Sequence, residues 1–321
     1  MSTPLVSVVI ATYNRAHFIG EAILSVLDQT VQDSEIIVVD DGSTDATSQV
    51  LAQFGGRIQV VRQLNQGRSA ARNSGVSIAR ADIIAFLDSD DIWMPDKLAE
   101  QLSLFDAQPA VGLAHTFSDV VDENGVVLRK QTRRRQHLYR DAVRRGYTYE
   151  GMSQQCTMFL STVAIRRECW ESVGLMDTNI PAFEDWDWYL RVALNTKIDT
   201  IPEVLVHFRQ HVGNTSSEEF FEGRLKTCQK HLALLDKWSD SKLKGLPRCN
   251  FYLQLAGAYY VQGHTAESVS WMRKAVLIDK LVLLRPSCLR YSLAMLFPAV
   301  IVSFGRWLGR LLSGEVRHES S

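Results

Sequence analysis

The sequence predicts an α/β fold with a Rossmann-like, mixed but mostly parallel sheet flanked by helices and followed by a C-terminal helical appendage. Over the first 90 residues, short runs rich in β-branched residues alternate with helix-like stretches, as in parallel βαβ units. The 321 residues are 46% hydrophobic with a formal net charge of −1, which suits a globular protein and argues against nucleic-acid binding. From about residue 220 onward the pattern is helical.

The first part of the chain contains four predicted strands separated by three predicted helices. The strands are Val6–Ala11, Glu35–Val39, Ile58–Val61 and Ile83–Leu87, and the helices are 17–28, 45–54 and 68–80. Polar residues follow the first, second and fourth strands, in the segments ATYN, DDGSTD and DSDD. Because parallel α/β sheets bind ligands at the carboxyl ends of their strands, we expect these segments to share one site.

The segment FLDSDDIW, residues 86–93, places three carboxylates within four positions at the end of an apolar run: Asp88, Asp90 and Asp91. Carboxylates this close raise one another's pKa, and burying them unpaired is costly. A turn or a helix cap would use one or two of them. A divalent metal or a polyol would use all three.

After Met94-Pro95 we expect a helix to about Ala107, and then a hairpin over 111–130 with its turn at Asn124-Gly125. The stretch 129–145 carries eight Arg or Lys residues. It is interpreted either as a solvated loop or as a segment that attracts phosphates or an anionic membrane surface.

A further strand and helix, CTMFLSTVAIRRECWESVG, lead to the segment FEDWDWYLRVAL. We expect a catalytic domain over 1–219 and a helical region over 220–321. Within the latter, residues 255–279 have the spacing of one tetratricopeptide-like helix pair. Since such repeats need neighbours to bury their core, a single copy indicates a helical appendage rather than an array.

The segment 285–312 is the most apolar part of the C-terminal region. Residues 291–305 carry no charge and are flanked by Arg290 and Arg306. As a helix they would be about 22 Å long at ~1.5 Å per residue, short of the ~30 Å hydrocarbon core of a bilayer. A core helix and a helix lying in the membrane interface both fit. Trp307 among leucines favours membrane contact.

Two further features of the sequence, its cysteines and its N-terminal segment, indicate the cellular compartment of the protein. The five cysteines include no CxxC pair, and the N-terminal segment lacks the basic region of a signal peptide. We therefore expect free thiols and a cytoplasmic protein, peripheral on the cytoplasmic face of the membrane.

Five segments, in this order and spacing, resemble family 2 of the glycosyltransferases: VSVVIATYNR, EIIVVDDGSTDAT, NQGRSAARNSG, ADIIAFLDSDDIW and FEDWDWYLR. The resemblance covers roughly residues 4 to 215. It implies an inverting enzyme with the A-type nucleotide-sugar-binding fold. Such an enzyme transfers a sugar from a nucleoside-diphosphate sugar, here expected to be UDP-linked, to a glycan or lipid-linked glycan.

The resemblance assigns the acidic segment to a divalent cation, Mn²⁺ or Mg²⁺, at the donor diphosphate. It implies Asp90 as a metal ligand and Asp88 as a group near the ribose or a metal-bound water, with Asp91 as a cap or supporting group. Hard cations prefer oxygen ligands and keep waters, so one or two carboxylates suffice. The cation would act as a Lewis acid on the leaving diphosphate.

The resemblance places the nucleoside at the ends of the first two strands. Thr12 and Tyr13 would line this part, with the Tyr13 ring stacking on the base. Asp41 would accept its imide N–H, and Asp40 would support the loop or touch the ribose. A flat apolar ring and an acceptor-only carboxylate both suit uracil. The DDGSTD segment also reads as an ordinary strand-to-helix turn.

The donor phosphates are assigned to basic residues in two segments. NQGRSAARNSG offers Arg68 and Arg72, although Arg72 could instead cover its own helix. HFRQHVGNTS resembles the family's loop over the diphosphate, which makes Arg209 and His211 candidates; an exposed loop residue is the alternative for the histidine.

The family's ED motif corresponds to Glu184-Asp185, with Asp185 as the catalytic base. At the start of a helix the dipole favours the anion, so we expect Asp185 to be deprotonated before the acceptor arrives. Helix capping is the alternative for this pair. Trp186 and Trp188 are expected to pack in the core or to stack on a sugar.

Three other enzyme classes lack their motifs in this sequence: GxGxxG of dinucleotide-binding enzymes, GxxxxGK[ST] of P-loop NTPases and GxSxG of hydrolases. A non-catalytic helical scaffold or a nucleotide-sugar-binding protein is the alternative function. The expected acceptors, glycans of the kind made in cell-envelope polysaccharide biosynthesis, rest on the basic stretch and the apolar tail.

Overall fold

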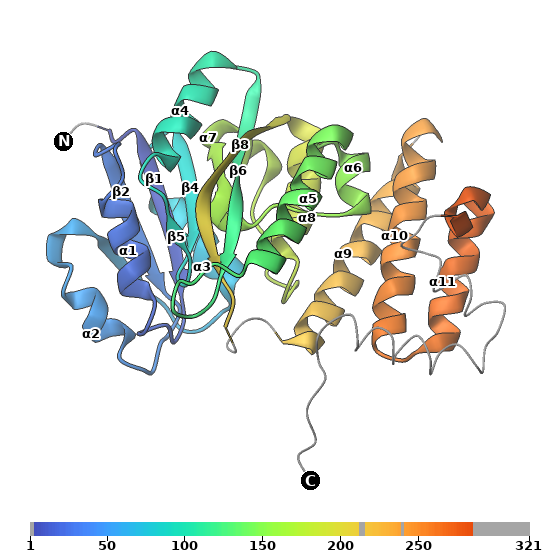
Figure 1. The fold of residues 1–321 in the computed structure, drawn as a ribbon, viewed down its shortest axis with the longest axis horizontal. Helices are drawn as coiled ribbons and strands as arrows, with labels where there is room; N and C mark the ends of the chain where they lie inside the picture. Colours follow the sequence, from blue (N-terminus) through green and yellow to red (C-terminus); the bar gives the residue numbers. More distant parts are fainter. Residues whose placement is uncertain (1–2, 212–215, 239–240, 285–321) are drawn as a thin grey trace, which may run out of the picture. The chain divides into compact units, whose positions relative to one another are not determined.

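The computed structural model describes residues 3–211, 216–238 and 241–284 (Figure 1). The chain divides into two compact units, Met1–Gly223 and Arg224–Ser321. The predicted membrane segment 285–312 lies outside the described residues. Within the described part, no helix is both long and apolar enough to cross a membrane.

The first unit is built on an eight-stranded sheet with the order β3-β2-β1-β4-β7-β6-β8-β5. The strands are β1 Val6–Thr12, β2 Ser34–Asp40, β3 Gln59–Arg62, β4 Ile83–Asp88, β5 Ile92–Trp93, β6 Val111–Val121, β7 Val163–Arg166 and β8 Lys197–Arg209. The pairs β2–β3, β1–β2 and β1–β4 are parallel, as is β6–β8, whereas β7 is antiparallel to both of its neighbours and β5 is antiparallel to β8. The predicted α/β fold with a mixed, mostly parallel sheet is confirmed.

Helices cover both faces of this sheet (Figure 1). In the first unit they are α1 Ile19–Leu27, α2 Thr47–Ala52, α3 Arg68–Ile78, α4 Lys97–Ala107, α5 Arg129–Arg145, α6 Tyr149–Gln154, α7 Arg167–Val173 and α8 Glu184–Asn195. Val8 and Ile10 of β1 lie in one buried cluster with Ile23 of α1. Val9 points to the other face, where a Cβ on Gly75 of α3 would come within 2.5 Å of it. The alternation along β1 thus packs a helix against each face.

The predicted hairpin over 111–130 is wrong. The Asn124-Gly125 turn forms, with Asp122 N–H donating to Val126 O, but the returning strand consists of a single bridge, Val121 to Val127. The loop interpretation of 129–145 is also wrong, because these residues form α5. Thr132, Tyr139 and Ala142 recur at helical spacing and are buried, so this face of α5 packs on β6.

The second unit is helical in its described part. Helix α9, Ser217–Lys237, runs from the first unit into the second, and α10 Ser241–Val261 and α11 Thr265–Ile278 follow. The helices α10 and α11 share a buried cluster that includes Ala256 and Met272. The predicted helix pair over 255–279 therefore forms, with Gly263 at φ 82° in the turn between the two helices.

Candidate active site

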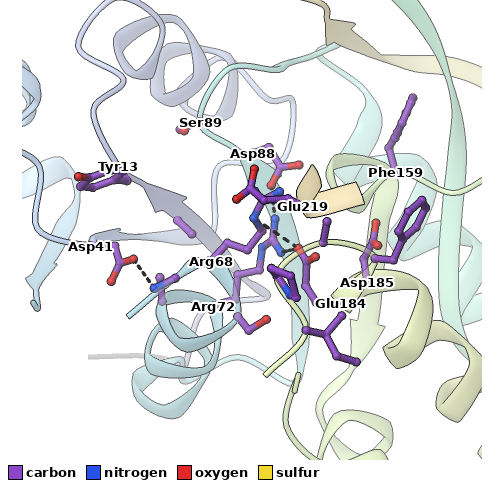
Figure 2. Close-up of a pocket in the computed structure, with 18 of the residues that line it drawn as sticks. Tyr13, Asp41, Arg68, Arg72, Asp88, Ser89, Phe159, Glu184, Asp185 and Glu219 are labelled. Atoms are coloured by element: carbon purple, nitrogen blue, oxygen red, sulfur yellow. Dashed lines mark hydrogen bonds and ion pairs between the residues drawn. The ribbon is translucent and has the colours of Figure 1, made fainter. Parts of the chain in front are cut away.

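A pocket of about 820 Å³ lies in the first unit at the carboxyl ends of β1, β2 and β4 (Figure 2). Most of the residues expected to form the site line it: Thr12, Tyr13, Asp41, Arg68, Arg72, Asp88, Asp90, Glu184 and Asp185. Figure 2 shows Tyr13 and Asp41 at one side of the pocket, and Phe159 and Asp185 at the other. Its volume is in the range of pockets that hold small molecules.

The side of the pocket at Tyr13 combines an exposed ring with a buried carboxylate. Tyr13 is 44% exposed, whereas Asp41 is 3% exposed. Asp41 accepts hydrogen bonds from Gln63 Nε2 and from the backbone N–H groups of Gln66 and Gly67, which fill three of its about four acceptor positions. The remaining position lies on Oδ2.

Two residues lie next to this side of the pocket, Asp40 and Thr12, and of these Thr12 lines it. Asp40 accepts from Ser43 N–H, a contact that holds the loop after β2. The hydroxyl of Thr12 is buried and has no hydrogen-bond partner among the residues that the structure describes. A buried, unsatisfied hydroxyl is costly, and in a pocket it indicates a position that a ligand can satisfy.

The three aspartates after β4 have separate surroundings. Asp91 is 1% exposed and accepts from Ser161 Oγ and from the backbone N–H of Arg209. Burial, and then the charges of Asp90 and Asp88, raise the pKa of Asp91 well above its usual range. Asp91 is thus a buried structural group, while Asp88 and Asp90 line the pocket.

Asp90 is the aspartate held by His211 and Arg15. Its Oδ2 lies 2.8 Å from His211 Nε2 and 3.5 Å from Arg15 Nε. Burial alone would raise the pKa of Asp90, but the hydrogen bond from His211 and the charge of Arg15 together lower it below its usual range. Asp90 is therefore held as an anion.

Arg72 of α3 joins the acidic segment to the start of α8. Its Nη2 lies 2.7 Å from Asp88 Oδ1 and its Nη1 lies 2.6 Å from Glu184 Oε1. Burial alone would lower the pKa of this guanidinium, but the two carboxylates raise it. At 6% exposure, Arg72 is the buried counter-ion of two carboxylates that come from different elements.

Asp185 occupies the first turn of α8, after a residue with unusual backbone geometry. Phe183 has φ 62°, the left-handed region that non-glycine residues rarely adopt, and it directs Glu184 and Asp185 into the pocket. Burial, and then the charge of Glu184, raise the pKa of Asp185 to about 7, although Arg72 opposes the shift. We expected the helix dipole to leave Asp185 deprotonated before the acceptor arrives, but at a pKa of about 7 only about half of this carboxyl group is ionised at pH 7.

The structure does not bring Arg209 and His211 to the pocket lining. The guanidinium of Arg209 is 2% exposed, donates to the backbone oxygens of Asp90 and Glu123, and pairs with Glu21. His211 acts on the pocket through Asp90. Arg68 does line the pocket and lies 3.9 Å from Glu184.

Several lining residues were missed by the sequence analysis. Arg15 directly follows the ATYN segment, so its place in the VSVVIATYNR motif could have pointed to it. Arg135, Phe159 and Phe208 come from α5, from the loop after α6 and from β8, and no local pattern links them. Trp186 also lines the pocket, whereas Trp188 is fully buried in the core.

The acidic segment offers Asp88 and Asp90 as carboxylate ligands for a divalent cation. Among the residues that the structure describes, no three His, Cys, Asp or Glu side chains are grouped so as to hold a metal ion. Mg²⁺ and Mn²⁺ are commonly bound by one or two carboxylates together with waters and substrate phosphates. Asp88 and Asp90 fit a cation shared with a diphosphate, and do not fit an all-protein cage.

Comparison with known sequences points to one family. A family model described as Glycosyl transferase family 2 matches residues 7–167. An uncharacterized glycosyltransferase of Nostoc sp. is 34% identical over 214 residues, which are 65% of this chain and 66% of that protein. One from Methanocaldococcus jannaschii is 29% identical over 216 residues, covering 65% of this chain and 72% of that protein. One from Rickettsia felis is 32% identical over 64% of this chain, which is 33% of its own length.

Comparison with solved structures supports the fold. The structure of S. aureus TarS 1–349 in complex with UDP matches with a TM-score of 0.67 at 18% identity, covering 95% of this chain and 91% of that chain. The mannosyltransferase PcManGT from Pyrobaculum calidifontis, in complex with GDP-Man and Mn²⁺, matches with a TM-score of 0.55 at 20% identity over 97% and 86% of the two chains. At these identities the likeness establishes a shared fold.

Proposed function

The chain belongs to family 2 of the glycosyltransferases, and we propose that it transfers a sugar from a UDP-linked donor to a hydroxyl group of a glycan or lipid-linked acceptor. The observation that carries this proposal is a single pocket lined by Tyr13, Asp41, the pair Asp88 and Asp90, and Asp185. The TarS complexes with UDP and UDP-GlcNAc support the donor class, as does the mannosyltransferase complex with GDP-Man.

In the proposed complex the nucleoside lies at Tyr13 and Asp41. The exposed Tyr13 ring offers a flat apolar face to a base. Asp41 Oδ2 has room for one more donor, and the imide N–H of uracil is such a donor. Because three protein groups already fix the Asp41 carboxylate, it is pre-organised for this contact.

The donor diphosphate lies beside Asp88 and Asp90 in this proposal. These two carboxylates would hold Mn²⁺ or Mg²⁺, which when bound would neutralise charge on the leaving diphosphate. Arg15 and Arg68, which line the same part of the pocket, supply further positive charge next to it. Arg72 forms ion pairs with Asp88 and Glu184, so its role is to stabilise these two carboxylates.

The transfer step uses Asp185 as general base. The acceptor hydroxyl gives its proton to the Asp185 carboxylate while its oxygen forms a bond to the anomeric carbon. The bond from that carbon to the diphosphate oxygen breaks on the opposite face, and the nucleoside diphosphate leaves. A single displacement of this kind inverts the anomeric centre. A pKa of about 7 suits a base that works near neutral pH.

Release of nucleoside diphosphate from a panel of UDP-, GDP- and dTDP-sugars, with Mn²⁺ and with EDTA, tests the proposal. We expect release from a UDP-sugar that depends on the metal. No release from any donor, together with retained nucleotide binding, would favour the alternative of a nucleotide-sugar-binding protein. No binding of any nucleotide would favour the helical scaffold.

The acceptor side of the proposal includes membrane contact through residues 285–312, which lie outside the described residues. Their apolar sequence with bordering arginines supports it. We expect the full chain to float with anionic liposomes, and we expect a chain ending at residue 284 not to float with them. A full-length protein that never floats would contradict this part of the proposal.

A further inference from the structure

The end of the pocket at Asp185 is lined by three side chains that the proposed donor complex does not use. Arg135 comes from α5, Phe159 from the loop after α6, and Phe208 from β8. Phe159 and Phe208 are stacked, with ring centroids 3.8 Å apart and planes 7° from parallel. The Arg135 guanidinium lies over the Phe159 ring, 3.3 Å from its centroid.

The charge of Arg135 is not neutralised by the part of the chain that the structure describes. Its guanidinium has five N–H donors, and the one hydrogen bond that they make to described residues is from Nη2 to Thr157 O, at 2.6 Å. Its Nε is buried without a hydrogen-bond partner. No carboxylate among those residues forms an ion pair with it, in contrast to Arg72, which pairs with two.

This cation lies on the same side of the pocket as the proposed base. Cys156, which also lines the pocket, is within electrostatic reach of both groups. Burial, and then the charge of Asp185, raise the pKa of the Cys156 thiol, while Arg135 opposes the shift. Asp185 and Arg135 therefore line one pocket and both act on Cys156, so one acceptor molecule can contact the two residues.

Helix α5 adds positive charge outside the pocket. Its exposed cationic side chains are Arg129, Lys130, Arg133, Arg134, Arg140, Arg144 and Arg145. Asp141 is the one acidic residue in the helix, and it pairs with Arg144. An exposed helix of this composition attracts anions, and Arg135 is its one cation that lines the pocket.

We propose that Arg135, Phe159 and Phe208 form an acceptor subsite for a sugar that carries a phosphate group. Phe208 and Arg135 occupy the two faces of the Phe159 ring, so the edges of the stacked rings offer the apolar surface to the sugar. The guanidinium pairs with the phosphate through its open N–H groups. This inference rests on the proposed function, since it names the acceptor class of the same site. The exposed cations on α5 add attraction for an anionic acceptor.

Binding of glucose 6-phosphate, with glucose as the neutral comparison, tests the subsite in full-length protein first saturated with UDP and Mn²⁺. Calorimetry measures both affinities. We expect the wild type to bind glucose 6-phosphate at least about tenfold more tightly than glucose, a typical gain for a charge-assisted contact. Arg135→Gln should remove that preference.

Arg140→Gln is the matched control, because Arg140 is an exposed arginine of the same helix that does not line the pocket. It should keep the preference for glucose 6-phosphate. Equal affinity of the wild type for the two sugars, or an equal loss in both variants, would overturn the subsite. If UDP itself does not bind, the proposed function fails, and that failure is seen before any acceptor is added.

Two further measurements complete the test. Arg135→Lys retains the charge but not the planar guanidinium, so its preference for glucose 6-phosphate over glucose should be intermediate. This variant replaces Arg135→Gln in the test if Arg135→Gln does not fold. Decyl glucosyl phosphate and a glycerol phosphate oligomer, titrated in the same way, separate a lipid-linked acceptor from a phosphate-bearing polymer. Arg135-dependent binding of the first probe supports a lipid-linked source of the phosphate, and that of the second supports a polymer. Binding of either probe that is unchanged in Arg135→Gln would overturn the subsite.

Discussion

Asp185 shows two opposing effects on one carboxylate. Its place in the first turn of α8 favours the anion through the helix dipole. Burial and the adjacent Glu184 favour the neutral acid, and these effects prevail, because the pKa is raised to about 7. The dipole effect is worth about 0.3–1 kcal/mol, whereas a rise from about 4 to about 7 corresponds to roughly 4 kcal/mol.

The pH dependence of transfer follows from this pKa. Asp185 accepts a proton only when it is ionised, so its active fraction rises from about a tenth at pH 6 to about nine tenths at pH 8 for a pKa of about 7. We expect the initial rate at saturating donor to rise by up to about tenfold over this range. A rate that stays flat between pH 5.5 and 8 would show that Asp185 is not the base.

Replacing the base gives a second prediction for the same residue. Asp185→Asn keeps the size of the side chain but cannot take a proton, so we expect transfer to slow by at least ~10²-fold. The donor dissociation constant, measured by calorimetry, should change little, since Asp185 faces the acceptor in the proposed complex. Near-normal transfer by the variant would move the base elsewhere, with Glu184 the first candidate.

At this scale most of the site residues predicted from the sequence do line the pocket, but their charge states were not predicted. Tyr13, Asp41, Asp90 and Asp185 were expected in one site because they follow predicted strands or belong to a family motif. The raised pKa of Asp185 could not be read from its position, because it depends on burial by residues distant in the chain. Arg135 was missed for the same reason.

At the scale of elements, Arg72 connects helix α3 with strand β4 and with the start of α8. Arg72→Gln would leave Asp88 and Glu184 as close, partly buried carboxylates without their counter-ion. Removing one partner of a buried ion pair costs about 3–5 kcal/mol. We therefore expect a clear fall in the free energy of unfolding, measured by urea denaturation at pH 7.

The control for this prediction is Arg62→Gln. Arg62 pairs with Asp40 from a side chain that is 62% exposed, and exposed pairs contribute about 0–1 kcal/mol. A loss for Arg72→Gln no larger than that for Arg62→Gln would contradict the structural role of the buried pair.

The elements also differ in how far the sequence predicted them. The alternating strands and helices before residue 90 lie within two residues of their predicted bounds, because each strand is a short apolar run with polar residues at its end. The region 111–145 was predicted less well. A good turn signal at Asn124-Gly125 suggested a returning strand, but the burial of α5 against β6 outweighed it.

At the scale of the whole molecule, every residue that lines the pocket lies within the unit Met1–Gly223. A chain ending at Lys237, the last residue of α9, should therefore bind UDP about as tightly as the full chain does. We expect affinities within about threefold of each other by calorimetry in Mn²⁺. Loss of UDP binding by a shortened chain that still melts cooperatively would mean that the second unit contributes to the donor site.

The central claim is a donor site in which Asp90 holds a divalent cation against the diphosphate, and calorimetric titration with UDP tests it most directly. Wild type in Mn²⁺, wild type in EDTA and Asp90→Ala in Mn²⁺ are compared. We expect tight binding in the first case and binding at least ~10-fold weaker in the other two, because EDTA removes the cation and Asp90→Ala removes a hard oxygen ligand for it. Equal UDP affinity for the wild type and Asp90→Ala at saturating Mn²⁺ would contradict it.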